Sequence, residues 1–232
     1  MDINFDFFSK RFSKLKCMDT GAAEFAGDQE DIAPGKECAF PRDGKAEAHA
    51  ALGQAYARGQ RFDEAYAQFA DWSALSLLDE ERPMVVVRTF SKTWSMAAAR
   101  LGYVVAPTWV VNELEKVILP YHLDTAKQIA GRLALTFVHE MEERVRFVVS
   151  ERERLSAAMA RLPVDVFPSG ANFVLFRPRS MRGRDVWQCL LDRSVLVRDC
   201  SGWPRLADCL RVTIGTRDEN DAFLAALQEV LS

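Results

Sequence analysis

The stretch from Val85 to Ala106, VVVRTFSKTWSMAAARLGYVVA, constrains the fold more than any other part of the chain. Two short apolar runs flank a lysine, Lys92, and a segment of small residues. A β-branched run bounded by turn residues is typical of a strand that is buried on both faces. A buried ammonium group is costly unless it is paired or its pKa falls. We therefore take Lys92 as the candidate centre of chemistry and expect it to be buried.

The composition of the chain argues against nucleic acid and membranes as binding partners. The 232 residues are 49% apolar and 27% charged, with a net charge of −3. A slightly acidic chain lacks the excess of Lys and Arg that is typical of nucleic-acid-binding proteins. No apolar run is long enough to span a bilayer, and the first residues, MDINFDFF, lack the layout of a signal peptide. We expect a cytoplasmic protein that binds neither nucleic acid nor a membrane.

Cysteines and histidines indicate neither a metal site nor a disulfide framework. The five cysteines form no CxxC pair and are odd in number, and the three histidines lie far apart in the sequence. We expect reduced and mostly buried thiols. The residues are Cys17, Cys38, Cys189, Cys200, Cys209, His49, His122 and His139.

The N-terminal region, residues 1–61, is expected to be an irregular and helical segment. Glycines and prolines punctuate an acidic stretch up to residue 47. From Ala48 to Ala70 apolar residues recur at helical spacing, which predicts helices. The same stretch resembles one tetratricopeptide repeat, but a single repeat cannot bury its own face, and no second copy follows.

From residue 71 onward, helix and strand patterns alternate, which indicates an α/β or α+β fold. The longest helix expected, 138–162, has an apolar stripe and a charged face that includes Glu151 and Arg152, which we interpret as solvated. The last helix has Asp218 or Thr216 as its cap. We expect a short helix within 71–82, strands at 84–87, 100–105, 172–176, 195–198 and 210–214, and further helices within 107–135, at 185–191 and at 219–231.

Four stretches together resemble one family. They are Asp63-Glu64-Ala65-Tyr66, Arg88-Thr89-Phe90-Ser91-Lys92 with Arg100 following, Val197-Arg198-Asp199, and Leu210-Arg211-Val212-Thr213-Ile214-Gly215-Thr216. In these motifs the chain resembles the fold-type I, pyridoxal-phosphate-dependent aminotransferases of class I/II, and most of all the histidinol-phosphate aminotransferases. The resemblance covers residues 62–231. It implies an α/β fold in which 62–137 is a remnant of the cofactor-binding large domain and 138–232 is the smaller C-terminal domain.

The resemblance also implies a role for each site residue. Lys92 would form a Schiff base with pyridoxal 5'-phosphate, because lysine is the side chain suited to that bond. Hydroxyls and an arginine fork suit the cofactor phosphate, and a carboxylate keeps the pyridine nitrogen protonated. The implied residues are Thr89, Ser91 and Arg100 for the phosphate, Asp63 for the ring nitrogen, Tyr66 for the ring phenolate oxygen, and Arg198 and Arg211 for the anionic end of the substrate.

Other interpretations of these residues stay open at this point. Arg198 could simply pair with Asp199 or Asp192. Asp63 and Tyr66, three residues apart, could share one face of a plain helix. Arg211 stands in an otherwise apolar strand, where an unpaired charge is costly, and this favours a functional role.

Two departures from the family pattern bear on the fold. The family has a far longer segment before the Asp-x-x-Tyr motif, with a glycine-rich helix start, an aromatic that stacks on the ring, and an Asn-Pro…Pro-Thr-Gly stretch. Residues 1–61 do not match it, so we expect a truncated sheet with an exposed edge. Ser95 and Ala98 also stand where the family has glycine. If position 98 requires a positive φ, alanine there costs about 1 kcal/mol or more.

These observations give three functional hypotheses. The first is transfer of an amino group between histidinol phosphate, or a similar phosphorylated amine, and 2-oxoglutarate, as in histidine biosynthesis, by a homodimer as in the family. The second is an enzyme similar to threonine-phosphate decarboxylase, which shares the lysine and the arginines. The third is a shortened aminotransferase remnant that is catalytically weak or inactive.

Overall fold

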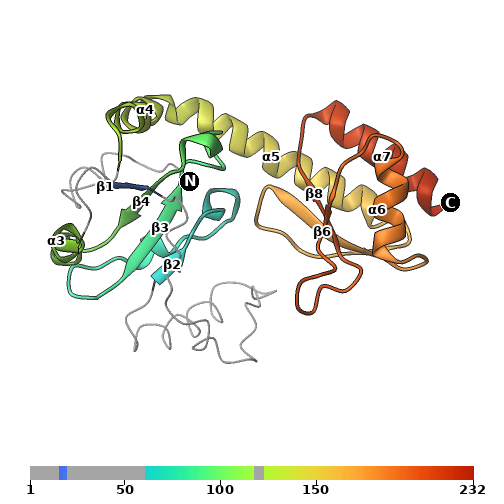
Figure 1. The fold of residues 1–232 in the computed structure, drawn as a ribbon, viewed down its shortest axis with the longest axis horizontal. Helices are drawn as coiled ribbons and strands as arrows, with labels where there is room; N and C mark the ends of the chain where they lie inside the picture. The colour runs from blue at the N-terminus through green and yellow to red at the C-terminus, as the bar shows by residue number, and fades with distance from the viewer. Residues whose placement is uncertain (1–15, 20–60, 118–122) are drawn as a thin grey trace. The chain divides into compact units, whose positions relative to one another are not determined.

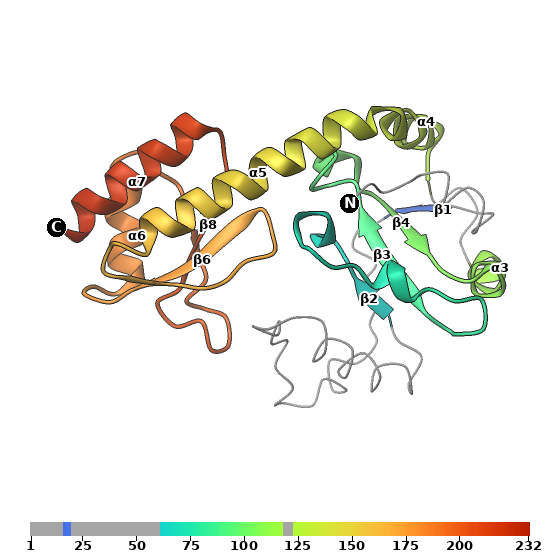
Figure 2. The same ribbon diagram turned by 180° about the vertical axis from the view of Figure 1, so that it is seen from behind.

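A computed structural model describes residues 16–19, 61–117 and 123–232. The chain divides into two compact units (Figures 1 and 2). Unit 1 comprises residues 1–65 and 73–136, and unit 2 comprises residues 66–72 and 137–232. The expected domain boundary at 137–138 lies one residue from this division, but residues 66–72 belong with the C-terminal unit. Within the described ranges, no helix is long and apolar enough to cross a membrane.

The sheet of unit 1 has the strand order β1-β4-β3-β2. Its strands are β1 (Lys16–Asp19), β2 (Arg61–Asp63), β3 (Val85–Thr89) and β4 (Leu101–Val105). β2 runs parallel to β3, whereas β4 is antiparallel to both β3 and β1. The sequence patterns correctly predict β3 and β4. They do not predict β1, and its pairing with β4 covers an edge that we expected to be exposed.

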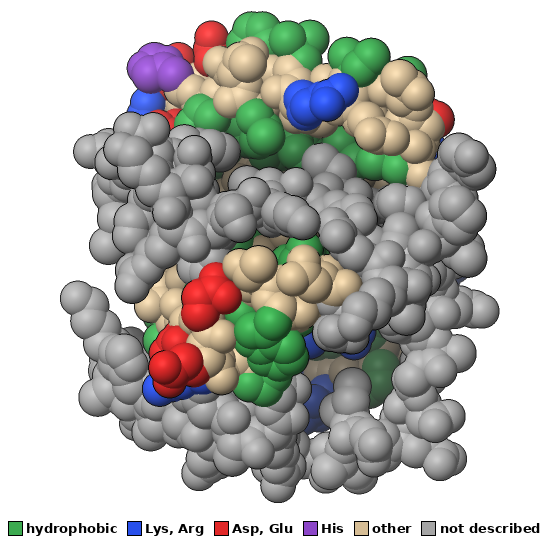
Figure 3. Space-filling model, turned by 90° about the vertical axis from the view of Figure 1, so that its left-hand side faces the viewer, with side chains coloured by type: hydrophobic (Ala, Val, Ile, Leu, Met, Phe, Trp, Pro, Cys, Tyr) green, Lys and Arg blue, Asp and Glu red, His purple; other side chains and the backbone are tan. Residues whose placement is uncertain are grey.

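The central strands of unit 1 are covered on both faces, as their β-branched sequences predict. On one face Val86 and Val105 pack with Ala74, which lies in a 3₁₀ turn, Ala74–Leu77. On the other face Val104 packs with Val111 of α3 (Thr108–Val117). Helix α4 (Thr125–Ala134) follows, capped by the Asp124 side chain. Figure 3 shows hydrophobic side chains along the upper edge of this unit, where α4 runs; Ile129 and Leu133 of this helix are 53% and 57% exposed.

The helix expected over Ala48–Ala70 is wrong for its described part. Residues 61–63 form β2, and residues 67–69 form only a 3₁₀ turn. The reason is tertiary, because the backbone of β2 pairs with that of β3 in register from Arg61 opposite Val85 to Asp63 opposite Val87. Asp63 therefore ends a strand and does not share a helix face with Tyr66. Residues 48–60, including most of the repeat-like stretch, lie outside the described residues.

Unit 2 consists of an antiparallel sheet, order β5-β6-β8-β7, with helices packed on one face (Figure 1). Its core contains Phe176, Leu210 and Phe223 among many apolar side chains from strands and helices. The sequence patterns predict every element except β5, and place the start of β7 too early. The elements are α5 (Val138–Met159), β5 (Val164–Val166), β6 (Phe173–Pro178), α6 (Gly183–Leu191), β7 (Arg198–Asp199), β8 (Leu210–Thr213) and α7 (Arg217–Leu231).

Thiol burial in unit 2 follows the expectation. Cys200 and Cys209 are buried and Cys189 is half-buried, and all three are free thiols. Burial raises the pKa of the Cys200 thiol, so this side chain behaves as a small apolar residue and not as a reactive one.

Candidate cofactor and substrate site

The topology of unit 1 brings five of the predicted residues to one edge of its sheet. Parallel strands have their carboxyl ends at the same edge, so the ends of β2 and β3 lie together. Asp63 is the last residue of β2, and Thr89 is the last of β3, followed by Ser91 and Lys92. Because β4 is antiparallel to β3, its first residue lies at this edge too, directly after Arg100. In α/β sheets, ligands bind outside the carboxyl ends of the strands.

Two hydroxyl groups at this edge are held together. The Oγ atoms of Thr89 and Ser91 lie 2.9 Å apart, and the Ser91 N–H donates to Thr89 Oγ1 at 3.0 Å. Thr89 Oγ1 also lies 3.3 Å from the Leu101 carbonyl oxygen on β4. The turn after β3 is thus fixed to the start of β4, and both hydroxyls are partly accessible. Such a pair suits the oxygens of a phosphate.

Lys92 follows these hydroxyls and is half-buried, so the expectation of a buried ammonium is wrong. The apolar residues around it, not the lysine, fill the interior: Phe90 and Trp94 are buried, with ring centroids 5.7 Å apart. Phe90 also contacts Tyr103 of β4 edge-on at 5.5 Å. This packing anchors the loop on either side of Lys92.

The loop reaches Arg100 through two left-handed backbone conformations. Ser95 has φ 56° and Arg100 has φ 52°. Arg100 is exposed, and its Nη1 donates to the Ala97 carbonyl at 3.3 Å. Ala98 has no positive φ, so the backbone cost considered for that position falls on Ser95 instead.

Asp63 and Tyr66 separate after β2. Asp63 is exposed, and its Oδ1 accepts a hydrogen bond from the Ala65 N–H at 3.1 Å. Tyr66 belongs to unit 2, where its ring meets Phe173 edge-on at 5.5 Å. The Arg211 guanidinium lies over the same Phe173 ring, with Cζ 4.9 Å from the centroid. Phe173 thus joins two residues whose proximity the sequence does not predict.

Arg198 and Arg211, the two predicted substrate residues, are brought together. They occupy opposing positions on β7 and β8. Arg211 Nε is buried and has no hydrogen-bond partner among the described residues. A buried donor without a partner is costly, and a bound anion would relieve that cost.

The acidic residues considered as partners for Arg198 bind elsewhere. Asp199 approaches Arg184 at 3.8 Å, and Asp192 accepts a hydrogen bond from Gln188 at 2.8 Å. No ion pair joins either of them to Arg198 in the part of the chain that the structure describes. Arg198 itself is exposed.

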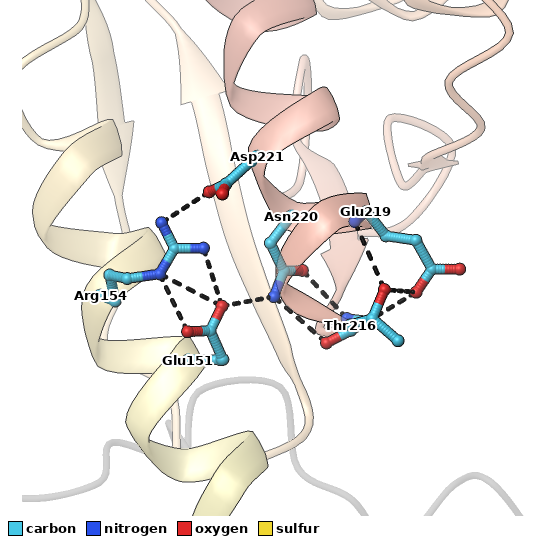
Figure 4. A network of polar contacts seen from close by, with 7 residues as sticks. Glu151, Arg154, Thr216, Glu219, Asn220 and Asp221 are labelled. Carbon is cyan, nitrogen blue, oxygen red and sulfur yellow. Dashed lines mark hydrogen bonds and ion pairs between the residues drawn. The ribbon is translucent and has the colours of Figure 1, made fainter.

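A polar network behind β8 corrects one interpretation of α5. Glu151 is only 3% exposed and does not belong to a solvated face. It accepts from Arg154 at 2.8 Å and from Asn220 Nδ2 at 3.0 Å, and Arg154 also contacts Asp221 at 2.7 Å (Figure 4). The hydrogen bonds from Arg154, and then from Asn220, lower the pKa of Glu151 to about 2. The carboxylate is therefore charged at neutral pH and serves as a structural anchor.

Arg152 is the second exception on this face, because its guanidinium binds two backbone carbonyls. Its Nη1 donates to the Phe69 oxygen at 2.9 Å and to the Ala171 oxygen at 3.0 Å. Burial lowers its pKa. Arg152 thus attaches the segment that follows Tyr66 to the segment that precedes Phe173. Its position on the charged face of the helix gave no sequence signal for this role.

The network extends to the turn that follows β8. Asn220 Oδ1 accepts from the Gly215 N–H at 3.0 Å, and its Nδ2 lies 3.2 Å from the Gly215 carbonyl oxygen. Thr216, and not Asp218, caps α7, in a reciprocal capping box with Glu219. The sequence patterns did not predict a structural role for Asn220. Its position could have indicated this role. Asn220 lies in the first turn of the helix that follows Gly215-Thr216, where an amide side chain can bind the backbone of the preceding turn.

The donor set of unit 1 fits pyridoxal phosphate. An amine, two adjacent hydroxyls, a guanidinium and an exposed carboxylate at one sheet edge match an aldehyde, a phosphate and a ring nitrogen. In unit 2, the Nε of Arg211, which has no partner within the described ranges, has the chemistry of an anion-binding group.

The family model and the sequence relative that match this chain are both aminotransferases. A model of the family described as aminotransferase class I and II matches residues 61–227. Histidinol-phosphate aminotransferase 2 of Nitrosococcus oceani is 40% identical over 169 residues, which cover 72% of this chain and 46% of the relative. The chain thus spans about half the length of the relatives it matches.

Solved structures show the same fold. The histidinol-phosphate aminotransferase of Sinorhizobium meliloti, in complex with pyridoxal-5'-phosphate, has a TM-score of 0.67 at 25% identity, covering 80% of this chain and 52% of that one. The L-threonine-O-3-phosphate decarboxylase of Porphyromonas gingivalis has a TM-score of 0.70 at 22% identity, with coverages of 80% and 58%.

Proposed function

The chain belongs to the class I and II aminotransferases, and we propose that it takes part in pyridoxal-phosphate-dependent amino transfer. The donor is histidinol phosphate or a similar phosphorylated amine, and the acceptor is 2-oxoglutarate. The observation that carries the proposal is the gathering of Asp63, Lys92 and the Thr89–Ser91 hydroxyl pair at one edge of the unit 1 sheet.

Each site residue has a separate proposed role. Lys92 would hold the cofactor covalently through its amine, and once the substrate amine has displaced that bond the freed lysine would move a proton to and from the substrate carbon. Thr89, Ser91 and Arg100 bind the phosphate. Asp63 keeps the ring nitrogen protonated and Tyr66 donates to the ring oxygen. When bound, pyridoxal phosphate supplies an electron sink for the carbanion that forms at the substrate carbon.

The arginines of unit 2 select the substrate. Two cations on opposing strand positions suit a doubly charged group such as a phosphate monoester, or a carboxylate that binds the Arg211 fork. This specificity explains how a phosphorylated amine and a 2-oxo acid can use the same pair in alternate half-reactions.

Decarboxylation of a phosphorylated amino acid is the competing chemistry. The likeness to the threonine-phosphate decarboxylase, at 22% identity, concerns the fold alone. The relative at 40% identity is named a histidinol-phosphate aminotransferase, and this supports amino transfer. A homodimer, as in the family, is part of the proposal and is tested by sedimentation equilibrium.

The test is covalent cofactor binding by the purified full chain. Mixed with pyridoxal phosphate, the protein should show the visible absorption of a lysine Schiff base, and the band should be absent from Lys92→Ala. Lys127→Ala is the matched control, since that lysine lies on α4 and pairs with Asp124 at 3.3 Å, and it should keep the band. Absence of the band from the unaltered chain would contradict the proposal and would favour the third hypothesis, an inactive aminotransferase remnant.

A second assay separates the two chemistries. Amino transfer from histidinol phosphate to 2-oxoglutarate is followed as glutamate formation, and decarboxylation of threonine phosphate as carbon dioxide release. Glutamate without carbon dioxide supports the proposal. The reverse result assigns the chain to the decarboxylases.

A further inference from the structure

Unit 1 contains a buried ion pair that the proposed roles do not use. Glu64 and Arg88 are 7% and 4% exposed. Arg88 Nη2 and Nε donate to Glu64 Oε2 at 2.9 and 3.1 Å. Both residues stand inside the family-like motifs, yet neither carries a role in binding the cofactor or substrate.

The pair is satisfied by a third segment of chain. Ser73 Oγ lies 2.8 Å from Glu64 Oε2 and accepts from Arg88 Nη2 at 2.9 Å. The Ala74 N–H donates to Glu64 Oε1, and Ser73 Oγ caps the 3₁₀ turn by accepting from the Leu75 N–H at 3.1 Å. Both carboxylate oxygens of Glu64, and Nε and Nη2 of Arg88, therefore have partners, which is the condition under which a buried ion pair is tolerated.

The position of the pair relates it to the proposed cofactor site. Glu64 directly follows Asp63, and its own N–H donates to the Val87 carbonyl of β3 at 2.8 Å. Arg88 precedes Thr89 and stands four residues before Lys92. The ion pair thus ties the segment that carries the carboxylate to the segment that carries the hydroxyls and the amine, at the edge where both must meet one small molecule.

We propose that Glu64 and Arg88 are positioning residues that fix Asp63 relative to the Thr89–Lys92 segment, and so set the affinity and protonation of pyridoxal phosphate. The inference rests on the proposed function. Stability alone does not account for the pair, because well-packed apolar residues of similar volume stabilise a buried site equally well or better. A role in geometry accounts for the pair better. Displacing a reacting or binding group by about 1 Å can cost about a hundredfold in rate.

The decisive variant replaces both charges with apolar side chains, Glu64→Leu with Arg88→Met. This double variant leaves no uncompensated charge, although the Ala74 N–H loses its acceptor. Its melting temperature should therefore fall somewhat, and its affinity is measured at a temperature at which both proteins are folded. Its affinity for pyridoxal phosphate, from titration of the visible band, should fall at least about tenfold. The pH midpoint of the band should also shift, because Asp63 no longer faces the ring nitrogen as before.

Three further measurements make the result unambiguous. Arg88→Lys keeps the charge but not the fork, so it should recover part of the affinity. Amide hydrogen exchange without cofactor should become faster in residues 61–65 of the double variant than in the rest of unit 1. Glu80→Gln is the control, since that carboxylate binds the Thr108 N–H at 3.0 Å in the same unit, and its affinity should be unchanged.

The outcomes separate this inference from the proposed function. If the unaltered chain gives no visible band, the proposed function and the inference both fall. If the unaltered chain gives the band and the double variant binds with the same affinity and pH midpoint, only the inference is overturned. If the double variant does not fold, Arg88→Lys with unchanged affinity and exchange overturns it.

Discussion

Arg198 and Arg211 stand directly opposite each other on neighbouring strands, β7 and β8. Like charges at opposing positions of an antiparallel pair destabilise it, and Arg211 Nε has no hydrogen-bond partner among the described residues. The arrangement therefore has an unfavourable energy that a bound anion would relieve. The proposed role of these two arginines can therefore be tested by a stability measurement on the protein without cofactor or turnover.

The first prediction is that inorganic phosphate stabilises the cofactor-free protein. At ten times its Kd, phosphate should add about 1.4 kcal/mol to the free energy of unfolding, measured by thermal melting at constant ionic strength. Arg211→Met should melt at or slightly above the unaltered chain without phosphate and gain less from adding it, because only the proposed phosphate site of unit 1 remains. Arg146→Met, which alters an arginine that approaches Glu142 at 4.0 Å, is the control. Equal gains in all three proteins would contradict the prediction.

The second prediction concerns acid. The Glu151 pKa is lowered from its ordinary 4.5 to about 2, so the folded state favours the charged form. The stabilisation is fully present above pH 4.5 and is lost as the pH falls towards 2. Urea unfolding should show Glu151→Gln much less stable than the unaltered chain at pH 7, with the difference shrinking between pH 4.5 and 2. A difference that does not depend on pH would refute this role of the charge.

The third prediction concerns the clamp on the turn after β8. Asn220→Ala removes both contacts to Gly215 and the hydrogen bond to Glu151. Buried polar groups left without partners cost about 1–3 kcal/mol each, so the free energy of unfolding should fall by about 2 kcal/mol or more. Gln188→Ala, which removes an exposed hydrogen bond to Asp192, should change it by about 0.5 kcal/mol or less. Similar values for the two variants would count against the clamp.

The fourth prediction compares backbone conformations in the loop that carries Lys92. Ser95 has φ 56°, whereas Ala98 has no positive φ. At position 95, glycine should be more stable than alanine by about 1 kcal/mol. At position 98, alanine should be more stable than glycine by about 0.5–1 kcal/mol. Melting of the variants Ser95→Gly, Ser95→Ala and Ala98→Gly checks both signs, and alanine favoured at position 95 would show that the loop has another conformation.

The sequence by itself determined the elements whose signal is local and repeated. The apolar stripe of α5 and the β-branched runs of β3 and β4 predict their structures, because the periodicity extends over several residues and tertiary contacts agree with it. The motifs around Lys92 and Arg211 likewise determined the family. These motifs place chemical groups at fixed spacing, which the sequence displays directly.

Only the tertiary structure decided the rest. Asp63 ends a strand because the three residues of β2 pair with β3, although the local pattern favours a helix. Glu151 is buried because Arg154 and Asn220 neutralise and bind it. The placement of Asp63 and Lys92 at one edge of the sheet, and the pairing of Arg198 with Arg211, depend on strand order and register. Those are long-range backbone pairings, and a local pattern contains no information about which distant strand will supply the partner.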